Sequence, residues 1–374
     1  MKNAAYRLFA VVFNLLVLLP LRRGTAALLS PHMAQFTDSL GEMEREMAER
    51  GYRTVRVSGR DVKPDAWTVS ALLRSLRFFT VGAYRLATAE IVFLNDNFMP
   101  MADLRIRPEA AWVQLWHAEG AFKRFGLDAV GDDPALEERV RRGSAKLRFV
   151  VCSSRGVVPI YAGAFGVAQE RVLPLGSPRA DRYIARNASL DSRAFRAQYL
   201  GGTEKKVVLY APTFRDNPAE NRRLLEAFDF NRFQRELGDR YTLVLRLHPQ
   251  FHDVPIPEGV CDMTGFADAA ALIAACDLLV TDYSSICMDF ALLGKPCVFY
   301  AFDLDRYADA RSFYFDYRAY VPGAVVQDFD SLLAAVADGG RDASALERFV
   351  AFNFDKPDGR SAARIADVVL TPQQ

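Results

Sequence analysis

Polar residues that could bind an anion gather directly after apolar runs of this chain. The clearest group is 281–285, Thr-Asp-Tyr-Ser-Ser, which follows the apolar run 278–280 and precedes a segment of helical periodicity. This pattern predicts a buried strand, a turn and a helix. Ser284 and Ser285 then lie at the helix start, where free N–H groups and the positive end of the helix dipole favour a phosphate. A simple N-cap is the alternative role for either serine, because serine is a preferred capping residue.

Four more polar loops follow predicted strands, at 117–126, 176–181, 211–216 and 248–249. In open parallel sheets, ligands bind outside the carboxyl ends of the strands, so these loops would share the edge where a ligand binds. Guanidinium forks, hydroxyls and an imidazole suit a bound diphosphate. Asp289 lies one helical turn after Ser285, where it would bond a ligand hydroxyl. Besides the two serines, the candidate diphosphate ligands are Arg179, Arg215, Arg246 and His248.

His117 is the candidate for proton transfer, because imidazole titrates near neutral pH and this residue directly follows a predicted strand. A capping or core histidine is the alternative. Glu119 would orient His117 or act as a second carboxylate, although an acidic residue in a first helical turn often only compensates the dipole. The aspartates between 282 and 316 have no metal-ligand spacing, and arginines can neutralise a diphosphate without magnesium. We therefore expect neither a metal nor a cofactor.

The elements that position these loops alternate between helical and extended patterns. With 374 residues, the chain is longer than one hydrophobic core usually serves. The alternation predicts an α/β fold of two Rossmann-like domains that face each other across a cleft, at 26–188 and 189–355. A last helix in 356–374 would cross back to the first domain. The predicted strands are 52–57, 91–94, 111–116, 148–152, 171–175, 207–210, 241–247, 278–280 and 297–300.

The first 25 residues contain an apolar segment, 8–21, that is flanked by basic residues. Asn14 and Pro20 interrupt this segment, and it is shorter than the roughly 20 residues that span a bilayer. We expect a helix on the membrane surface, with its basic ends near anionic headgroups. A buried first helix of the N-terminal domain is the alternative. The pair Arg22-Arg23 and the lack of a small-residue cleavage site argue against a signal peptide.

Composition narrows the choice of partners. The net charge is +1, so a nucleic-acid partner is not expected. The five cysteines have neither CxxC nor metal-ligand spacing, which argues against a disulfide framework or a zinc site and fits a reducing cytosol.

Together, the motifs resemble the CDP-glycerol glycerophosphotransferase family, the primases and polymerases of teichoic acids. Thr-Asp-Tyr-Ser-Ser at 281–285 is the most specific motif, and the whole set is strong because it spans residues 110 to 320 in the order of the family. The other matching segments are 116–117, 176–181, 210–216, 247–249, 289–291, 295–300, 303–307 and 313–316.

The resemblance implies a GT-B fold with the nucleotide in the second domain. It implies transfer of a polyol phosphate, glycerol phosphate first, from a CDP-activated donor to a hydroxyl of a membrane-linked wall or capsule polymer, with release of CMP. His117 would be the general base, and the enzyme would work at the cytoplasmic face of the membrane. CDP-glycerol, or another CDP-polyol, would be bound by Arg179, Thr213, Arg246, His248, Ser284, Ser285 and Asp289.

One segment departs from the family pattern. Many members have a His-Gly-Thr-Pro-like loop where this chain has His117-Ala-Glu-Gly-Ala-Phe122. The added carboxylate leaves the polyol and the acceptor open among glycerol phosphate, ribitol phosphate and a sugar-linked phosphate. Two other functions stay open: a GT-B glycosyltransferase that uses a nucleotide sugar, and a non-catalytic membrane-associated subunit that binds nucleotide.

Overall fold

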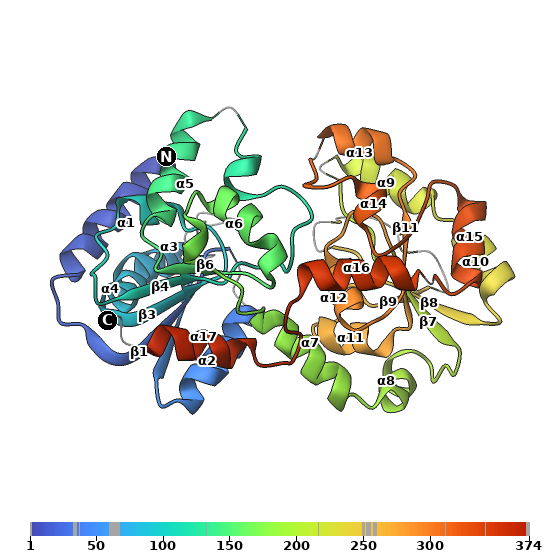
Figure 1. Cartoon of the computed structure of the whole chain (residues 1–374), viewed down its shortest axis with the longest axis horizontal. Coiled ribbons are helices and arrows are strands. Elements are labelled where there is room, and N and C mark those ends of the chain that lie inside the picture. Colours follow the sequence, from blue (N-terminus) through green and yellow to red (C-terminus); the bar gives the residue numbers. More distant parts are fainter. Residues whose placement is uncertain are drawn as a thin grey trace. The chain divides into compact units, whose positions relative to one another are not determined.

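The chain forms two compact units in a computed structural model (Figure 1). Unit 1 is Met1–Arg182 with Asn353–Gln374, and unit 2 is Tyr183–Phe352. The structure describes residues 2–371 except 33–35, 37, 60–67, 132, 216, 249–250, 252–255, 257–259, 311 and 341. Asp216 and Pro249 of the predicted loops therefore lie outside the described residues. The predicted α/β class with two parallel-sheet domains is confirmed.

The sheet of unit 1 is parallel throughout, in the order β2-β1-β3-β4-β5-β6. Its strands β3, β4 and β5 are short, mostly apolar and buried, as expected for the middle of a parallel sheet with helices on each side, whereas the edge strand β2 is polar and largely unburied. The pairing order reverses between β1 and β3. The strands are β1 (Arg22–Ser30), β2 (Arg53–Ser58), β3 (Ala89–Leu94), β4 (Ala111–Gln114), β5 (Phe149–Val151) and β6 (Val172–Leu173).

Helices of unit 1 begin at recognisable caps. Asp38, Thr68 and Asp133 each accept a hydrogen bond from a backbone N–H in the first turn of the following helix. The α-helices are α1 (Lys2–Leu16), α2 (Ser39–Glu49), α3 (Val69–Arg77), α4 (Ala83–Thr88), α5 (Pro134–Ser144), α6 (Val158–Phe165), α7 (Pro178–Ser189), which continues into unit 2, and α17 (Ser361–Leu370). The π-helix η2 (Phe78–Gly82) joins α3 to α4. Short 3-10 helices are η3 (Met99–Asp103), η4 (Gly126–Ala129), η5 (Arg155–Val157) and η6 (Gln169–Arg171).

The first helix and the last helix both belong to unit 1. Phe9 and Phe13 of α1 are buried, and Phe13 packs edge-on against Trp112 of β4. The last helix, α17, lies beside α2 (Figure 1), and its Ile365 joins the core that lies under β1, β3 and β4. Within the described residues, no helix is both long and apolar enough to cross a membrane.

Unit 2 repeats the same plan with its own parallel sheet, in the order β12-β11-β10-β7-β8-β9. The pairing order reverses between β7 and β10. Aromatic residues such as Phe228 and Phe233 fill the core on one side of the sheet. The strands are β7 (Lys206–Tyr210), β8 (Tyr241–Leu245), β9 (Cys261–Asp262), β10 (Leu278–Thr281), β11 (Cys297–Tyr300) and β12 (Gly323–Val326). The helices are α8 (Ser192–Tyr199), α9 (Pro218–Glu226), α10 (Phe230–Leu237), α11 (Ala269–Ala275), α12 (Ile286–Leu292), α13 (Leu304–Ala310), α14 (Tyr317–Tyr320), α15 (Phe329–Ala337) and α16 (Ala343–Asn353), whose last residue falls in unit 1.

Candidate active site

In unit 2, the loops after β7 and β10 meet where the strand order reverses, the place where open α/β sheets bind ligands. Asp282 ties the two loops together. Its Oδ1 accepts hydrogen bonds from the N–H of Thr213 (2.7 Å) and from the N–H of Tyr283 (2.6 Å). The hydroxyl of Thr281 donates to the carbonyl of Ala211 (2.7 Å) from the same strand end. The turn 281–285 is therefore fixed against the 211–215 loop by buried hydrogen bonds.

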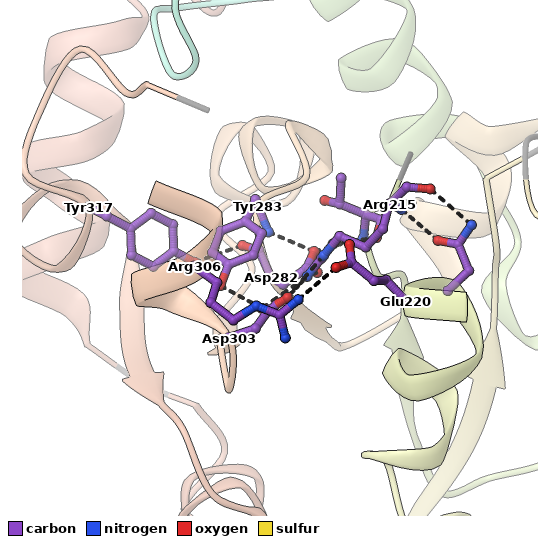
Figure 2. Close-up of polar contacts among 9 residues, drawn as sticks. Arg215, Glu220, Asp282, Tyr283, Asp303, Arg306 and Tyr317 are labelled. Atoms are coloured by element: carbon purple, nitrogen blue, oxygen red, sulfur yellow. Dashed lines mark hydrogen bonds and ion pairs between the residues drawn. The ribbon is translucent and has the colours of Figure 1, made fainter. Parts of the chain in front are cut away.

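A buried arginine braces this turn (Figure 2). The guanidinium of Arg215 forms ion pairs with Asp282 and Asp303, each at 2.9 Å, and Arg215 is only 7% exposed. It lies over the rings of Tyr283 and Tyr307, at 5.1 and 4.8 Å from their centroids. Burial opposes its charge, but the two carboxylates raise the pKa of Arg215 above its ordinary value. The guanidinium of Arg215, a predicted diphosphate ligand, is thus paired with carboxylates from the loops that surround the turn.

Two tyrosines extend this network (Figure 2). The hydroxyl of Tyr283 donates to Oδ1 of Asp303 (2.8 Å), and the hydroxyl of Tyr317 donates to the carbonyl of Asp282 (2.7 Å). Burial, reinforced by the Asp303 carboxylate, raises the pKa of Tyr283. Two of the aspartates between 282 and 316, Asp282 and Asp303, therefore form ion pairs with Arg215. Within the described residues, no group of three or more His, Cys, Asp or Glu side chains could hold a metal ion.

The hydroxyls at the turn differ in how they are used. Ser285 precedes α12 and is exposed, and its side chain makes no capping hydrogen bond. Ser284 accepts a long hydrogen bond, 3.4 Å, from the N–H of Ile286. Among the described residues, the buried Oγ1 of Thr213 has no hydrogen-bond partner. Asp289 is buried in the first turn of α12. Capping alone therefore does not explain Ser285, and Thr213 keeps an unsatisfied hydroxyl beside the same turn.

The loop after β8, on the other side of β7, carries the two remaining candidates of unit 2. Arg246 donates through Nη1 to the carbonyls of Met263 (3.0 Å) and Phe266 (2.9 Å), and burial lowers its pKa. His248 is exposed, and its ring stacks on Phe214 at 4.7 Å. Phe214 comes from the loop after β7, so this stacking connects the two loops.

In unit 1, the imidazole of His117 is held by the loop after β3. Its Nδ1 lies 3.2 Å from the carbonyl oxygen of Asn95 and 3.5 Å from Oδ2 of Asp96. A carbonyl oxygen can only accept a hydrogen bond, so this contact favours the neutral tautomer with the proton on Nδ1 and the lone pair on Nε2. The His117 side chain is 45% exposed. This geometry suits a base that takes a proton from an incoming hydroxyl.

The residue before His117 has an unusual backbone. Trp116 has a φ of 59°, the only positive value among the non-glycine residues that the structure describes. Its buried ring lies 4.1 Å from the ring of His117 and 4.9 Å from that of Phe125. Left-handed backbone is costly for a bulky residue and concentrates at functional sites. The strained turn and the packed indole therefore fix where the imidazole points.

Glu119 and Arg179, two predicted site residues, pair with each other. Glu119 is 4% exposed, and it accepts hydrogen bonds from Nη1 of Arg179 (2.6 Å) and from Oγ of Ser177 (2.9 Å). This buried pair joins the loop after β4 to the start of α7. In the described part of unit 1, the carboxylate beside His117 is instead that of Asp96. The sequence contained a sign of Asp96, since it follows the predicted strand 91–94 just as His117 follows the next one.

The model of the family described as CDP-glycerol:poly(glycerophosphate) glycerophosphotransferase matches residues 11–371. The chain belongs to this family. Among its members, the teichoic acid ribitol-phosphate primase of Bacillus spizizenii is 29% identical over 373 residues, which cover 96% of this chain and 95% of the primase. The teichoic acid poly(ribitol-phosphate) polymerase of the same organism is 35% identical over 302 residues, 78% of this chain. These cover 48% of the polymerase, so the match spans about half of its length.

Solved structures of the family confirm the predicted GT-B-like fold. A structure of the wall teichoic acid polymerase TagF superimposes with a TM-score of 0.77 over 98% of this chain and 95% of that chain. The two sequences are 21% identical, so this likeness concerns the fold.

Proposed function

We propose that this chain transfers a polyol phosphate from a CDP-polyol to a hydroxyl of a membrane-linked polymer and releases CMP. The observation that carries the proposal is the held imidazole of His117, with Nδ1 donating and Nε2 free, in a chain of this family. A GT-B glycosyltransferase would share the fold and could use the same base, so it is the family match that favours phosphate transfer; a non-catalytic nucleotide-binding subunit would have no use for a held proton acceptor.

In the proposed reaction, Nε2 of His117 takes the proton of the acceptor hydroxyl while the acceptor oxygen attacks the β-phosphorus of the donor. The bond from that phosphorus to the CMP oxygen breaks, and the electron pair leaves on CMP. Unit 2 would bind the donor at the reversal between β7 and β10. There the exposed hydroxyl of Ser285, the unsatisfied hydroxyl of Thr213 and nearby donors would offset the growing negative charge. We assign donor binding to Arg246, His248, Ser284 and Asp289 as well, and we propose the same role for Arg179.

The polyol is to be decided by assay. The relatives include the ribitol-phosphate enzymes above and a teichoic acid glycerol-phosphate primase of Bacillus spizizenii, 32% identical over 272 residues. One of the TagF structures that the chain resembles was obtained after a soak with CDPG. CDP-glycerol and CDP-ribitol should therefore be compared side by side, with a membrane extract as the source of acceptor.

The test is CMP release by wild type and by His117→Ala. We expect kcat to fall by about 10²- to 10⁴-fold, the usual contribution of a general base, while calorimetry shows unchanged binding of the CDP-polyol. His252→Ala, a histidine substitution at a position to which no role is assigned, is the control and should keep full activity. If His117→Ala turns over as fast as wild type, His117 is not the general base. Release of a nucleoside diphosphate would support sugar transfer, and binding without any turnover would support the non-catalytic subunit.

We further propose that unit 1 rests on the cytoplasmic surface of the membrane through α1 and α3. Most of the exposed large apolar side chains of the described residues lie on or beside these helices. On α3 only Ala71 is buried, and its four large apolar side chains are between 58% and 76% exposed; they are Val69, Leu72, Leu73 and Leu76. On α1 the exposed apolar side chains are Leu8, Val11 and Leu15. Apolar surface of this extent marks an interaction site.

Two further features favour a lipid surface as the partner. The helices meet, because Phe78 at the end of α3 packs against Phe9 of α1 at 5.1 Å. Both helices also carry basic residues: Arg74 and Arg77 in the last turn of α3, and the exposed Arg7 in the second turn of α1. A basic amphipathic helix binds anionic bilayers through its apolar face and its charges together. A lipid-linked acceptor would be met at this surface.

Vesicle sedimentation tests this surface. Wild type should bind vesicles that contain anionic phosphatidylglycerol more tightly than neutral phosphatidylcholine vesicles. Leu72→Ser with Leu76→Ser should weaken binding by about a hundredfold or more, because each substitution removes about 1.5–3 kcal/mol of apolar burial. Leu136→Ser on α5, another exposed leucine, is the matched control. A wild-type dimer that the double variant dissociates, with no vesicle binding, would instead make this face a subunit interface.

A further inference from the structure

We infer that Asp96 is the positioning residue of His117 and stabilises the imidazolium that forms during transfer. The inference rests on the proposed role of His117 as general base. It replaces Glu119 in the orienting role, because the hydrogen bonds of Glu119 go to Arg179 and Ser177, whereas Oδ2 of Asp96 lies 3.5 Å from Nδ1 of His117.

The loop of Asp96 is built to hold this carboxylate still. Its Oδ1 accepts from the N–H of Asn97 (2.6 Å), which leaves Oδ2 to face the imidazole. Its backbone carbonyl accepts from Nε2 of Gln114 (3.2 Å), while Oε1 of the same glutamine accepts from the N–H of Trp116 (2.9 Å). Gln114 is buried at the end of β4. One amide side chain therefore fixes the loop of Asp96 relative to the strained turn that presents His117.

A third loop reaches the same carboxylate. Nε2 of His32, just after β1, lies 3.8 Å from Oδ2 of Asp96. On the same side, Asp38 accepts from the side-chain amide of Asn95 (2.9 Å) and caps α2. The groups around His117 thus come from the ends of β1, β3 and β4, which are neighbours where the strand order of unit 1 reverses. Open α/β sheets bind their ligands at this position, so the arrangement is expected of a working site.

The chemistry follows from which atoms can accept a proton. Asn95 and Asp96 offer only acceptors to Nδ1, so they hold the tautomer in which Nε2 is the base. When Nε2 takes the proton of the acceptor hydroxyl, the ring gains a positive charge, and the nearby carboxylate offsets it. Asp96 stays ionised and receives no proton. The acceptor oxygen bonds to phosphorus, and the electron pair of the broken bond leaves with CMP.

The experiment is a double-mutant cycle of Asp96→Asn and His117→Ala, followed by CMP release. An asparagine of the same size can turn its amide toward Nδ1 and favour the wrong tautomer. We expect Asp96→Asn to lower kcat by about tenfold or more, with an unchanged KM for the CDP-polyol. Added to His117→Ala, the substitution should cause no further loss, because Asp96 acts only through the imidazole. Asp103→Asn, whose carboxylate pairs with Arg139 and Arg142, is the matched control and should keep wild-type kcat.

The outcomes separate this inference from the proposed function. Wild-type kcat in Asp96→Asn, with an inactive His117→Ala, would overturn the inference and leave the function intact. Turnover retained in His117→Ala would overturn the function itself. A double variant that is slower than His117→Ala by the full factor of Asp96→Asn would show that Asp96 acts independently of His117, which also overturns the inference. If Asp96→Asn lowers the melting temperature, Asp96→Ser repeats the test, since a serine hydroxyl can still accept from the N–H of Asn97.

Discussion

The two sheets carry their polar groups at the same topological place but in opposite ways. In unit 2, Arg215 is buried, and two carboxylates and two aromatic rings surround it. In unit 1, His117 is nearly half exposed, and it touches its carboxylate at 3.5 Å. A buried charge must be paired and hydrogen-bonded, so the network of unit 2 is expected to be stiff. A proton acceptor must stay reachable, so unit 1 leaves its imidazole open and fixes it through the backbone.

The difference suggests a division of labour. In unit 2, which we assign to the donor, the buried charge of Arg215 holds the shape of a turn. Hydroxyls and backbone groups of that turn are then the groups that we expect to contact the ligand. In the unit that we assign to proton transfer, the buried carboxylate of Glu119 pairs with Arg179, and a different carboxylate, that of Asp96, lies beside the base. Substitutions in the Arg215 network of unit 2 should therefore act mainly on stability, and substitutions around His117 in unit 1 should act mainly on turnover.

The largest stability effect is expected for Arg215→Met. Removing the guanidinium leaves Asp282 and Asp303 as unpaired carboxylates, and the free energy of unfolding should fall by about 3–5 kcal/mol. Urea unfolding followed by circular dichroism measures it. The control is Arg306→Met, which breaks the exposed pair with Glu220 (Figure 2) and should cost less than about 1 kcal/mol. Equal losses of unfolding free energy in Arg215→Met and Arg306→Met would show that the buried network does not stabilise unit 2 more than an exposed ion pair does.

A smaller effect is expected for Glu119→Gln. The neutral amide still reaches Ser177 but no longer offsets the charge of Arg179, so the loss of stability should be about 1.5–3 kcal/mol. Because Glu119 contacts Arg179 and Ser177, and Asp96 lies beside His117, kcat should fall far less than in Asp96→Asn, and an effect through Arg179 should appear in the KM for the CDP-polyol. Steady-state CMP release beside urea unfolding checks both statements. A fall in kcat as large as that of Asp96→Asn would restore Glu119 as a catalytic carboxylate.

The smallest effect is expected for Tyr317→Phe. This change removes one buried hydrogen bond, from the tyrosine hydroxyl to the carbonyl of Asp282, and should cost about 1 kcal/mol. Tyr199→Phe, at a partly exposed ring, serves as the control. A loss as large as that of Arg215→Met would mean that the tyrosine, and not the arginine, fixes the turn.

The sequence predicts most of the strands and the loops after them, because both signals are local. Runs such as 278–280 and 297–300 are apolar and short, and the structure has β10 and β11 there. It does not reveal β1, which is a central strand of unit 1. That strand opens with Arg-Arg-Gly-Thr at 22–25 and has no apolar run until Ala26, so the pattern resembles the flank of a membrane helix.

The site is predicted less completely than the fold. The position of Arg215 after a strand is visible in the sequence, but its partners, Asp282 and Asp303, lie 67 and 88 residues further on. A pairing between residues so far apart leaves no periodic pattern in the sequence. Without knowledge of the carboxylates that pair with it, an arginine after a strand is interpreted as a phosphate ligand. Glu119 shows the same limit, since Arg179 is 60 residues away. The functional roles of all the candidates, Arg215 and Glu119 included, stay predictions.

The placement of α17 bears on how the protein is made. Its Ile365 and Ala366 have no exposed surface and complete the core of unit 1, yet the ribosome adds them after all of unit 2. Part of the core of unit 1 therefore stays uncovered while unit 2, whose sequence lies between the two segments of unit 1, is synthesised and folds. Chaperone binding to the nascent chain should consequently persist until α17 has left the ribosome.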